Sequence, residues 1–308
     1  MNWRAAIIVT MSGLLLACQS SLPLSPAKVA AIRSHNLAGK ALVDGDVAAA
    51  DSGFREAMRQ AAALDDWHGE AESRLAWAVS LQRRGQREAA EGLLSPLLED
   101  LRLPYPLASQ QQALAWRAQW HLAAQAWPAL QQDLSRLNEL CQSECRPQVM
   151  LSSLQAQLAL HEKRFAEAAG LADRALRLAG NEITETRAYA LRVRANIALL
   201  QQPDQGLAPI MMALDLDRQL GNSAGIFQDL ILRTWLAYVL QAPDRIHWLH
   251  RTCQVAAGML SPVTEKMLQQ LPEELWHDYF LSFSTPEVHR AAAEQPPARD
   301  EQRRCRAT

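Results

Sequence analysis

A pattern that returns about every 40 residues constrains the fold of this chain more than any other feature of its sequence. Two stretches, residues 37–57 and 156–178, show the pattern clearly, because small residues surround a turn and a large apolar residue, Phe54 or Phe165. The turns inside the units are expected at Gly45, Gly85, Gln125, Lys163, Gln202 and Ala242. Successive units are then 38 to 40 residues apart, which is enough for two helices and their turn. One helix pair buries too little apolar surface to be stable alone, so the units are expected to stack.

The composition favours helices throughout the chain of 308 residues. Ala, Leu, Gln, Arg and Glu dominate, and there are only 13 glycines. These dominant residues lose the least free energy on entering a helix, so we expect an all-α protein. The 31 basic and 33 acidic residues leave a net charge of −2, so the chain as a whole provides no field to concentrate DNA, RNA or an anionic membrane surface. Nucleic acid is therefore not an expected partner.

The order of small residues, turn and large apolar residue resembles the tetratricopeptide repeat, whose common unit has about 34 residues. The resemblance covers residues 30–260 and implies a right-handed α-solenoid of about six helix hairpins with extended repeats of about 38–40 residues. A spacing near 40 also fits a HEAT-like array, although the placement of Gly, Phe and Ala favours the tetratricopeptide unit. In such solenoids the first helix of each pair lines a concave groove. Alignment with the family's groove-facing positions implies partner contacts at Arg83, Gln119, Gln157 and His161.

The beginning of the chain has the form of an export signal. Arg4 supplies a positive charge, and the mostly apolar run over residues 5–16 is too short to span a membrane. The run ends in Leu-Leu-Ala-Cys, which resembles the lipobox of bacterial lipoproteins and implies acylation of Cys18. An ordinary signal peptide with a chance cysteine is the alternative. We expect residues 1–17 to be a signal peptide that is cleaved off.

A segment rich in Ser and Pro follows Cys18, and residues 18–29 are expected to form a flexible tether. Gln19 is not the aspartate that retains enterobacterial lipoproteins in the inner membrane. The resemblance therefore implies the outer membrane, on its periplasmic face. Several acyl chains together anchor a protein stably, so the chain is expected to stay bound to the membrane.

The end of the solenoid is expected to be covered by its own segment. Residues 261–283 are expected to form two short capping helices, because Pro272 is followed by two glutamates, which suits a helix start. The residues expected to cover the last repeat are Trp276, Tyr279 and Phe280. Residues 284–308 are polar and rich in Pro, Arg and Glu, so we expect a disordered tail.

One short motif has the letters of a hydrolase. Residues 221–225 read G-x-S-x-G, with Ser223 at the position of a nucleophile. That motif requires a strand before it, and the preceding residues have a helical pattern instead. Gly221 is therefore expected to end a helix, with Asn222 or Ser223 capping the next one.

A second motif has the letters of a metal site. His247, His250 and Cys253 form an H-x-x-H-x-x-C run in which the two histidines could share one helix face. A closed zinc site needs four ligands, so we favour packing and surface roles for these three residues. We expect no catalytic residue, no metal and no cofactor.

Cys141 and Cys145 are expected to form a disulfide. The periplasm is oxidising, and both residues lie in a polar junction between the third and fourth units. Four residues apart in a regular helix they would be too distant, so the bridge requires a helix to end near Cys141. Two free thiols are the alternative. The pairing of Cys253 and Cys305 stays open at this point.

The function that these features favour is a scaffold or adaptor. A lipid-anchored tetratricopeptide protein is expected to bind an envelope protein or peptide of a wall-synthesis, wall-hydrolysis, outer-membrane assembly, pilus or secretion machine. A pilotin-like chaperone for a secretin or pilin is an alternative with the same fold. A periplasmic hydrolase using Ser223 or the histidines is the less favoured alternative. The sequence leaves the partner and the oligomeric state open.

Overall fold

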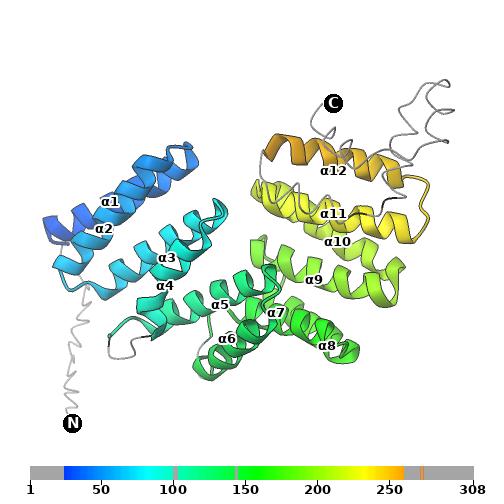
Figure 1. Cartoon of the computed structure of the whole chain (residues 1–308), viewed down its shortest axis with the longest axis horizontal. Coiled ribbons are helices and arrows are strands. Elements are labelled where there is room, and N and C mark those ends of the chain that lie inside the picture. Colours follow the sequence, from blue (N-terminus) through cyan, green and yellow to red (C-terminus); the bar gives the residue numbers. More distant parts are fainter. Residues whose placement is uncertain (1–23, 100–102, 143–144, 260–270, 272, 274–308) are drawn as a thin grey trace, which may run out of the picture. The chain divides into compact units, whose positions relative to one another are not determined.

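The computed structural model describes residues 24–99, 103–142, 145–259, 271 and 273, and over these residues it is all-helical (Figure 1). The first helices in chain order are α1 (Pro26–Val43), α2 (Val47–Ala63), α3 (Trp67–Arg83), α4 (Arg87–Glu99), α5 (Leu107–Ala123) and α6 (Trp127–Leu140). They are followed by α7 (Gln148–His161), α8 (Phe165–Ala179), α9 (Glu185–Gln201), the 3-10 helix η1 (Pro203–Gly206), α10 (Leu207–Leu220), α11 (Ser223–Val239) and α12 (Arg245–Met259). The expectation of an all-α protein is confirmed for this part of the chain.

The helices belong to two compact units, which are described separately. The first unit contains α1, α2 and α3, and each of these three helices packs on the other two. Its core is formed by Ala38, Ala50 and Phe54, with Ala76 and Trp77 of α3 packed against them. The small residues let the helices approach closely, and Phe54 fills the space between them. Phe54 was one of the large apolar residues that defined the repeat in the sequence.

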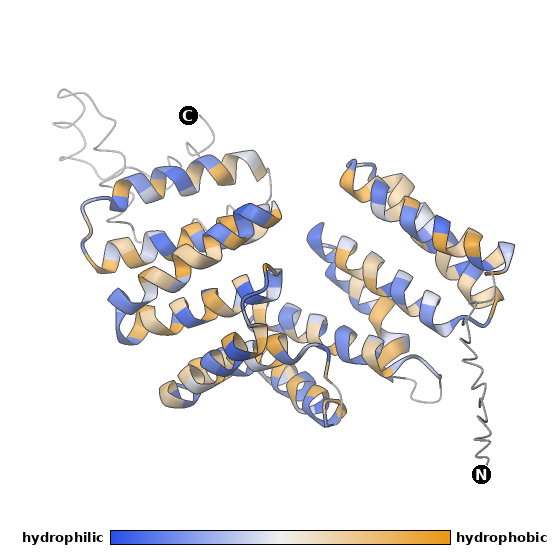
Figure 2. Cartoon of the chain, turned by 180° about the vertical axis from the view of Figure 1, so that it is seen from behind, coloured by the Kyte–Doolittle hydropathy of each residue, from blue (hydrophilic) through white to orange (hydrophobic). Residues whose placement is uncertain are grey.

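The second unit contains α4 to α12, and neighbouring helices pack in sequence order. Apolar and polar residues alternate around the helices, as an amphipathic stack requires (Figure 2). The centres of the helix pairs are again occupied by buried small residues, among them Ala118, Ala156, Ala168, Ala195 and Ala213. The order of packing is therefore local, each helix being held mainly by its neighbours in the chain.

Seven helices end in the same way, with one residue in the left-handed conformation. The residues with positive φ at these ends are Gly45, Asp65, Gly85, Gln125, Lys163, Gly221 and Gln241. At α1, for example, Gly45 N–H donates to the Leu42 carbonyl, and the next N–H, that of Asp46, donates to the Ala41 carbonyl. This pair of bonds is the Schellman motif, which satisfies carbonyls that a helix end leaves unpaired.

The expected turns can now be compared with these helix ends. Gly45, Gly85, Gln125 and Lys163 each occupy the left-handed position. The expected turn at Ala242 was one residue late, because Gln241 has the positive φ. The expected turn at Gln202 has another geometry: its φ is −146°, and Pro203 begins η1. The ring of a following proline disfavours the helical region, which explains this difference.

The helical part of the chain begins earlier than the expected residue 30. α1 starts at Pro26, and the hydroxyl of Ser25 accepts a hydrogen bond from Lys28 N–H at 3.2 Å. Serine at the N-cap followed by proline in the first turn is a strong helix start. The Ser-Pro pair that suggested a flexible tether is therefore a helix cap.

Beyond α12 only Leu271 and Glu273 are described. Leu271 is buried against Phe227, Leu249 and Cys253. This contact is compatible with a segment that covers the last hairpin. The rest of the expected capping segment, including Trp276, and the expected tail over residues 284–308 lie outside the described residues, as do Cys18 and the expected signal peptide.

Candidate binding face of the first helices

The first helices of successive hairpins contact one another in the second unit. α5 packs on α7, α7 on α9, and α9 on α11, whereas the second helices α6, α8 and α10 have no comparable contacts among themselves. Four residues recur at intervals of 38, 39 and 39 residues on these first helices: Gln119, Gln157, Asn196 and Trp235. We call the surface defined by these four residues and Tyr189 the first-helix face.

Polar side chains join two helices at the centre of this face. Asn196 of α9 donates from Nδ2 to Oε1 of Gln157 on α7, at 3.4 Å. The hydroxyl of Tyr189 is buried close to the Gln157 side chain and makes no hydrogen bond of good geometry in the described part of the chain. Burial raises the pKa of Tyr189 to about 12, so its hydroxyl stays a donor. The polar side chains of this face thus come together around Gln157.

The four residues that the sequence expected in a groove have different surroundings. Gln119 and Gln157 are half-buried at equivalent positions of α5 and α7. His161, at the end of α7, stacks on Trp127 of α6, with ring centroids 3.6 Å apart and planes at 7°. Arg83 is exposed at the end of α3 in the first unit. Gln119 and Gln157 thus belong to the first-helix face, and His161, which is exposed, lies one turn after Gln157.

A buried charged cluster lies beside this face, between α9, α10 and α11. Arg192 Nη2 lies 2.5 Å from Asp217 Oδ2, and Arg192 Nε lies 2.6 Å from Asp229 Oδ1. Both aspartates are fully buried. Asn222 Nδ2 also donates to Asp217 Oδ1, at 2.9 Å. One guanidinium thus faces two carboxylates, which leaves one excess negative charge unless a proton is bound.

The residue of this cluster that binds the proton is Asp229. Burial raises the pKa of Asp229 from 3.8 to about 7, the Asp217 carboxylate adds to the rise, and Arg192 opposes it. Its Oδ2 accepts no hydrogen bond within the described residues. An oxygen without a donor gains most from protonation, so the proton is expected at Oδ2. The cluster can therefore change its charge near neutral pH.

The G-x-S-x-G motif is part of this cluster. Gly221 ends α10 in the left-handed conformation, and Asn222 caps α11 by accepting a hydrogen bond from Gly225 N–H at 3.2 Å, as the sequence predicted. A Cβ added to Gly225 would lie 2.1 Å from Asp217 Oδ2. The last glycine of the motif is thus required by a buried carboxylate. Ser223 is exposed in the first turn of α11.

A second charged network joins α4, α5 and α6. Arg117 donates to both oxygens of the buried Asp133, at 2.6 and 2.9 Å. His121 Nε2 lies 3.4 Å from Asp133, and Arg87 lies 2.8 Å from the other ring nitrogen. Burial lowers the pKa of His121, with Arg87 contributing in the same direction and Asp133 opposing. The network holds these three helices together through their polar side chains.

The H-x-x-H-x-x-C motif does not assemble a metal site. His247 is exposed and packs edge-on against Trp248, while His250 lies 2.9 Å from the Gln254 amide. Cys253 is fully buried, and its sulfur is disulfide-bonded. A thiolate ligand is therefore not available in this state. No cluster of three metal-binding side chains occurs in the described part of the chain. Cys305 lies outside it.

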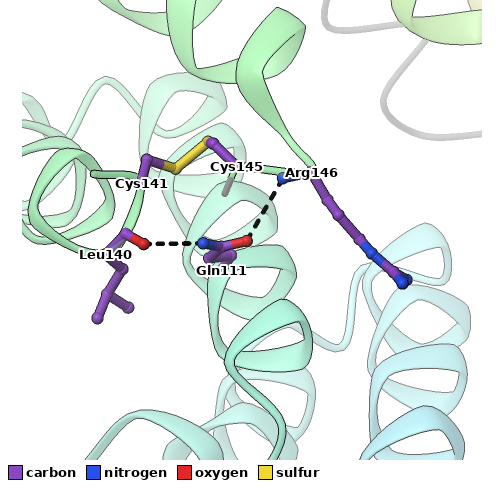
Figure 3. The surroundings of a disulfide bond; sticks show 5 residues. All are labelled: Gln111, Leu140, Cys141, Cys145 and Arg146. Atoms are coloured by element: carbon purple, nitrogen blue, oxygen red, sulfur yellow. Dashed lines mark hydrogen bonds between the residues drawn. A yellow bond between two sulfur atoms is a disulfide. The ribbon is translucent and has the colours of Figure 1, made fainter. Parts of the chain in front are cut away.

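The expected disulfide between Cys141 and Cys145 is present (Figure 3). Helix α6 ends at Leu140, so the two Cα atoms are only 4.5 Å apart, as the bond requires. Gln111 of α5 donates to the Leu140 carbonyl at 2.8 Å and accepts from Arg146 N–H at 3.4 Å. The bridged loop is thus held against α5 by one buried side chain.

Three groups were missed by the sequence reasoning: the Arg192 cluster, the His121 network and Gln111. A signal existed for the first, because Asp217 and Asp229 occupy positions where the helical pattern expects apolar residues. Their pairing with Arg192 required three helices to be placed in space. For Gln111 the surrounding residues carry no such signal.

A scan against models of known protein families finds no match to this chain, and a search of curated proteins finds none either. Among the described helices none is both long enough and apolar enough to cross a membrane.

Proposed function

We propose that this protein is a lipid-anchored scaffold of the tetratricopeptide type, with a protein segment bound on the first-helix face. The observation that carries the proposal is the recurrence of Gln119, Gln157, Asn196 and Trp235 at one-repeat intervals on first helices, three of which are linked by direct contacts to the next. A regular series of side chains offers a bound chain equivalent contacts at successive repeats.

The chemistry of the face suits a peptide. Amide side chains both donate and accept hydrogen bonds, as the backbone of a bound segment does. Trp235 adds a large, partly buried apolar side chain. A net charge of −2 does not favour nucleic acid as the partner.

The proposal also includes the location of the protein in the cell. Acylation of Cys18 would hold the chain on the periplasmic side of the outer membrane, where envelope machines operate. The partner class is a protein of wall synthesis or hydrolysis, outer-membrane assembly, a pilus or a secretion apparatus. The scaffold would keep such a protein at the membrane without chemistry of its own.

The test is photo-crosslinking in cells with the full-length lipidated protein. A photo-reactive amino acid at Gln119 or Gln157 is expected to capture one envelope protein, identified by mass spectrometry. The matched control is the same amino acid at Arg174, which is exposed on the second helix α8. A Cys18→Ala variant is expected to lose both its membrane location and the crosslink.

Two outcomes would contradict the proposal. One is capture from Arg174 but not from the first-helix face. The other is no captured protein although the chain is abundant and acylated. Capture of a secretin or pilin only while that subunit is being exported would point to the chaperone alternative instead.

A further inference from the structure

We infer that α1 lies on the anionic phospholipid surface of the membrane that anchors the chain, through a face formed by Val29, Ile32, Arg33, Leu37, Lys40 and Val43. We call these six residues the outer face of α1. The inference rests on the proposed acylation of Cys18, and all its structural observations belong to the first unit.

The opposite face of α1 packs against α2 and α3 inside the first unit. Ala31 and Ala38 are buried. Ser34 donates to Oε1 of Gln60 on α2 at 3.1 Å, and the His35 ring lies 3.0 Å from the Ser73 hydroxyl of α3. Since these contacts fix the rotation of α1 about its axis, they also determine which side chains point away from the unit.

The outer face is apolar and exposed. The exposed fractions are 49% for Val29, 42% for Ile32, 55% for Leu37 and 87% for Val43. The other three residues follow Val29 by 3, 8 and 14 positions. In a helix with about 3.6 residues per turn, these spacings place all four on one side. Four exposed aliphatic residues on one side of a helix form an apolar patch, and such patches often mark a site of contact with a protein or a membrane.

The charge of α1 indicates what the outer face contacts. Three basic residues, Lys28, Arg33 and Lys40, lie between Pro26 and Val43, and no acidic residue does. Arg33 and Lys40 follow Val29 by 4 and 11 positions, so they lie on the outer face among the apolar residues. Aliphatic side chains interleaved with basic ones are the composition of helices that lie in the interface of anionic membranes.

Two ion pairs of α1 do not oppose this assignment. Lys28 lies 3.4 Å from Asp66, and Lys40 pairs with Asp44 just after the helix. Both lysines are well exposed, and exposed ion pairs contribute little free energy. The lysines can therefore exchange these partners for phosphate groups.

The length of the connection brings α1 to the membrane. Leu24, the first described residue, is six positions after Cys18, so an extended chain between them spans at most about 22 Å. α1 itself, with 18 residues, is about 27 Å long. The acyl anchor thus keeps the start of the helix within about one helix length of the surface. At such a distance the contact of α1 with the surface is intramolecular, which strengthens it beyond the affinity that α1 has without the anchor.

The test uses the mature chain, residues 18–308, with Cys18→Ala, so that no acyl chain contributes to binding. Co-sedimentation is measured with vesicles of phosphatidylcholine alone and with vesicles that also contain phosphatidylglycerol. Binding is expected only to the second kind. Ile32→Glu and Arg33→Glu are each expected to weaken it by about tenfold. The matched controls are Ile183→Glu and Arg174→Glu, at exposed positions of the second unit, which are expected to bind as the unsubstituted chain does.

Each contrary result has a distinct meaning. Equal binding of the variants and the unsubstituted chain would overturn the inference, as would no binding to phosphatidylglycerol vesicles. Dimers that Ile32→Glu dissociates would show that a second copy covers the face. The mass of the N-terminal peptide from cells tests acylation separately, so a failed anchor is distinguishable from a failed membrane contact of α1.

Discussion

Asp229 is the residue whose acid–base behaviour departs furthest from the ordinary. It shares one guanidinium with Asp217, and both carboxylates are removed from water. Removing water disfavours the charged form, and a second carboxylate nearby adds to that effect. The native state therefore binds a proton on Asp229 that the unfolded chain loses at a much lower pH.

The pH dependence of stability follows from this difference. Between about pH 4 and pH 7 the folded chain carries the proton and the unfolded chain does not, so the free energy of unfolding falls as pH rises through this window. Asp229→Asn removes the titration and is expected to flatten this fall. Urea unfolding at pH 5 and pH 8 measures it. The half-exposed control Asp173→Asn is expected to keep the original dependence, and an equally steep fall in Asp229→Asn would contradict the assignment.

At the scale of the element, the helix ends are the most regular feature. Four of the seven left-handed residues are not glycine: Asp65, Gln125, Lys163 and Gln241. A side chain in this conformation brings Cβ close to the following carbonyl, which costs free energy that glycine avoids. The chain thus keeps some strain at its turns.

Replacement of such a residue by glycine is expected to stabilise the protein. Lys163→Gly is expected to raise the free energy of unfolding by about 1 kcal/mol, because its side chain is exposed and only the backbone strain changes. Arg174→Gly, at an exposed position inside α8, is expected to lower it by about 1 kcal/mol. Urea denaturation of the two variants gives the comparison. A loss of stability in Lys163→Gly would show that its backbone is not strained.

At the scale of the whole molecule, packing is local and the chain divides into two compact units. A structure held by neighbouring contacts is expected to lose stability where it is damaged and to keep it elsewhere. Phe54 and Phe227 are both nearly fully buried, one in each unit. They offer a matched pair for this question.

Phe54→Ala is expected to cost about 3–5 kcal/mol, as the loss of a buried aromatic residue does. Native-state hydrogen exchange is expected to show faster exchange in α1, α2 and α3, with α9 to α11 unchanged. Phe227→Ala is expected to give the reverse. Equal acceleration throughout the chain in either variant would mean that the two units unfold together.

The sequence by itself determined the helical class, four of the six expected turns and the local disulfide. These depend on contacts between near neighbours in the chain, such as the αL residues Gly45 and Lys163, the cap at Asn222 and the helix end before Cys141. The helix start at Pro26 could also have been predicted, because Ser25 before Pro26 is a typical helix cap; the expected tether included this pair instead.

Only the tertiary structure decided which side chains meet across helices. Arg192 reaches Asp217 and Asp229, 25 and 37 residues away, and Gln157 meets Asn196, 39 residues away. It also decided that His161 packs on Trp127 and that one side of α1 remains exposed. Such contacts depend on how far each helix is rotated about its axis when it packs. That rotation results from the fit of all its neighbours, and no short stretch of sequence carries it.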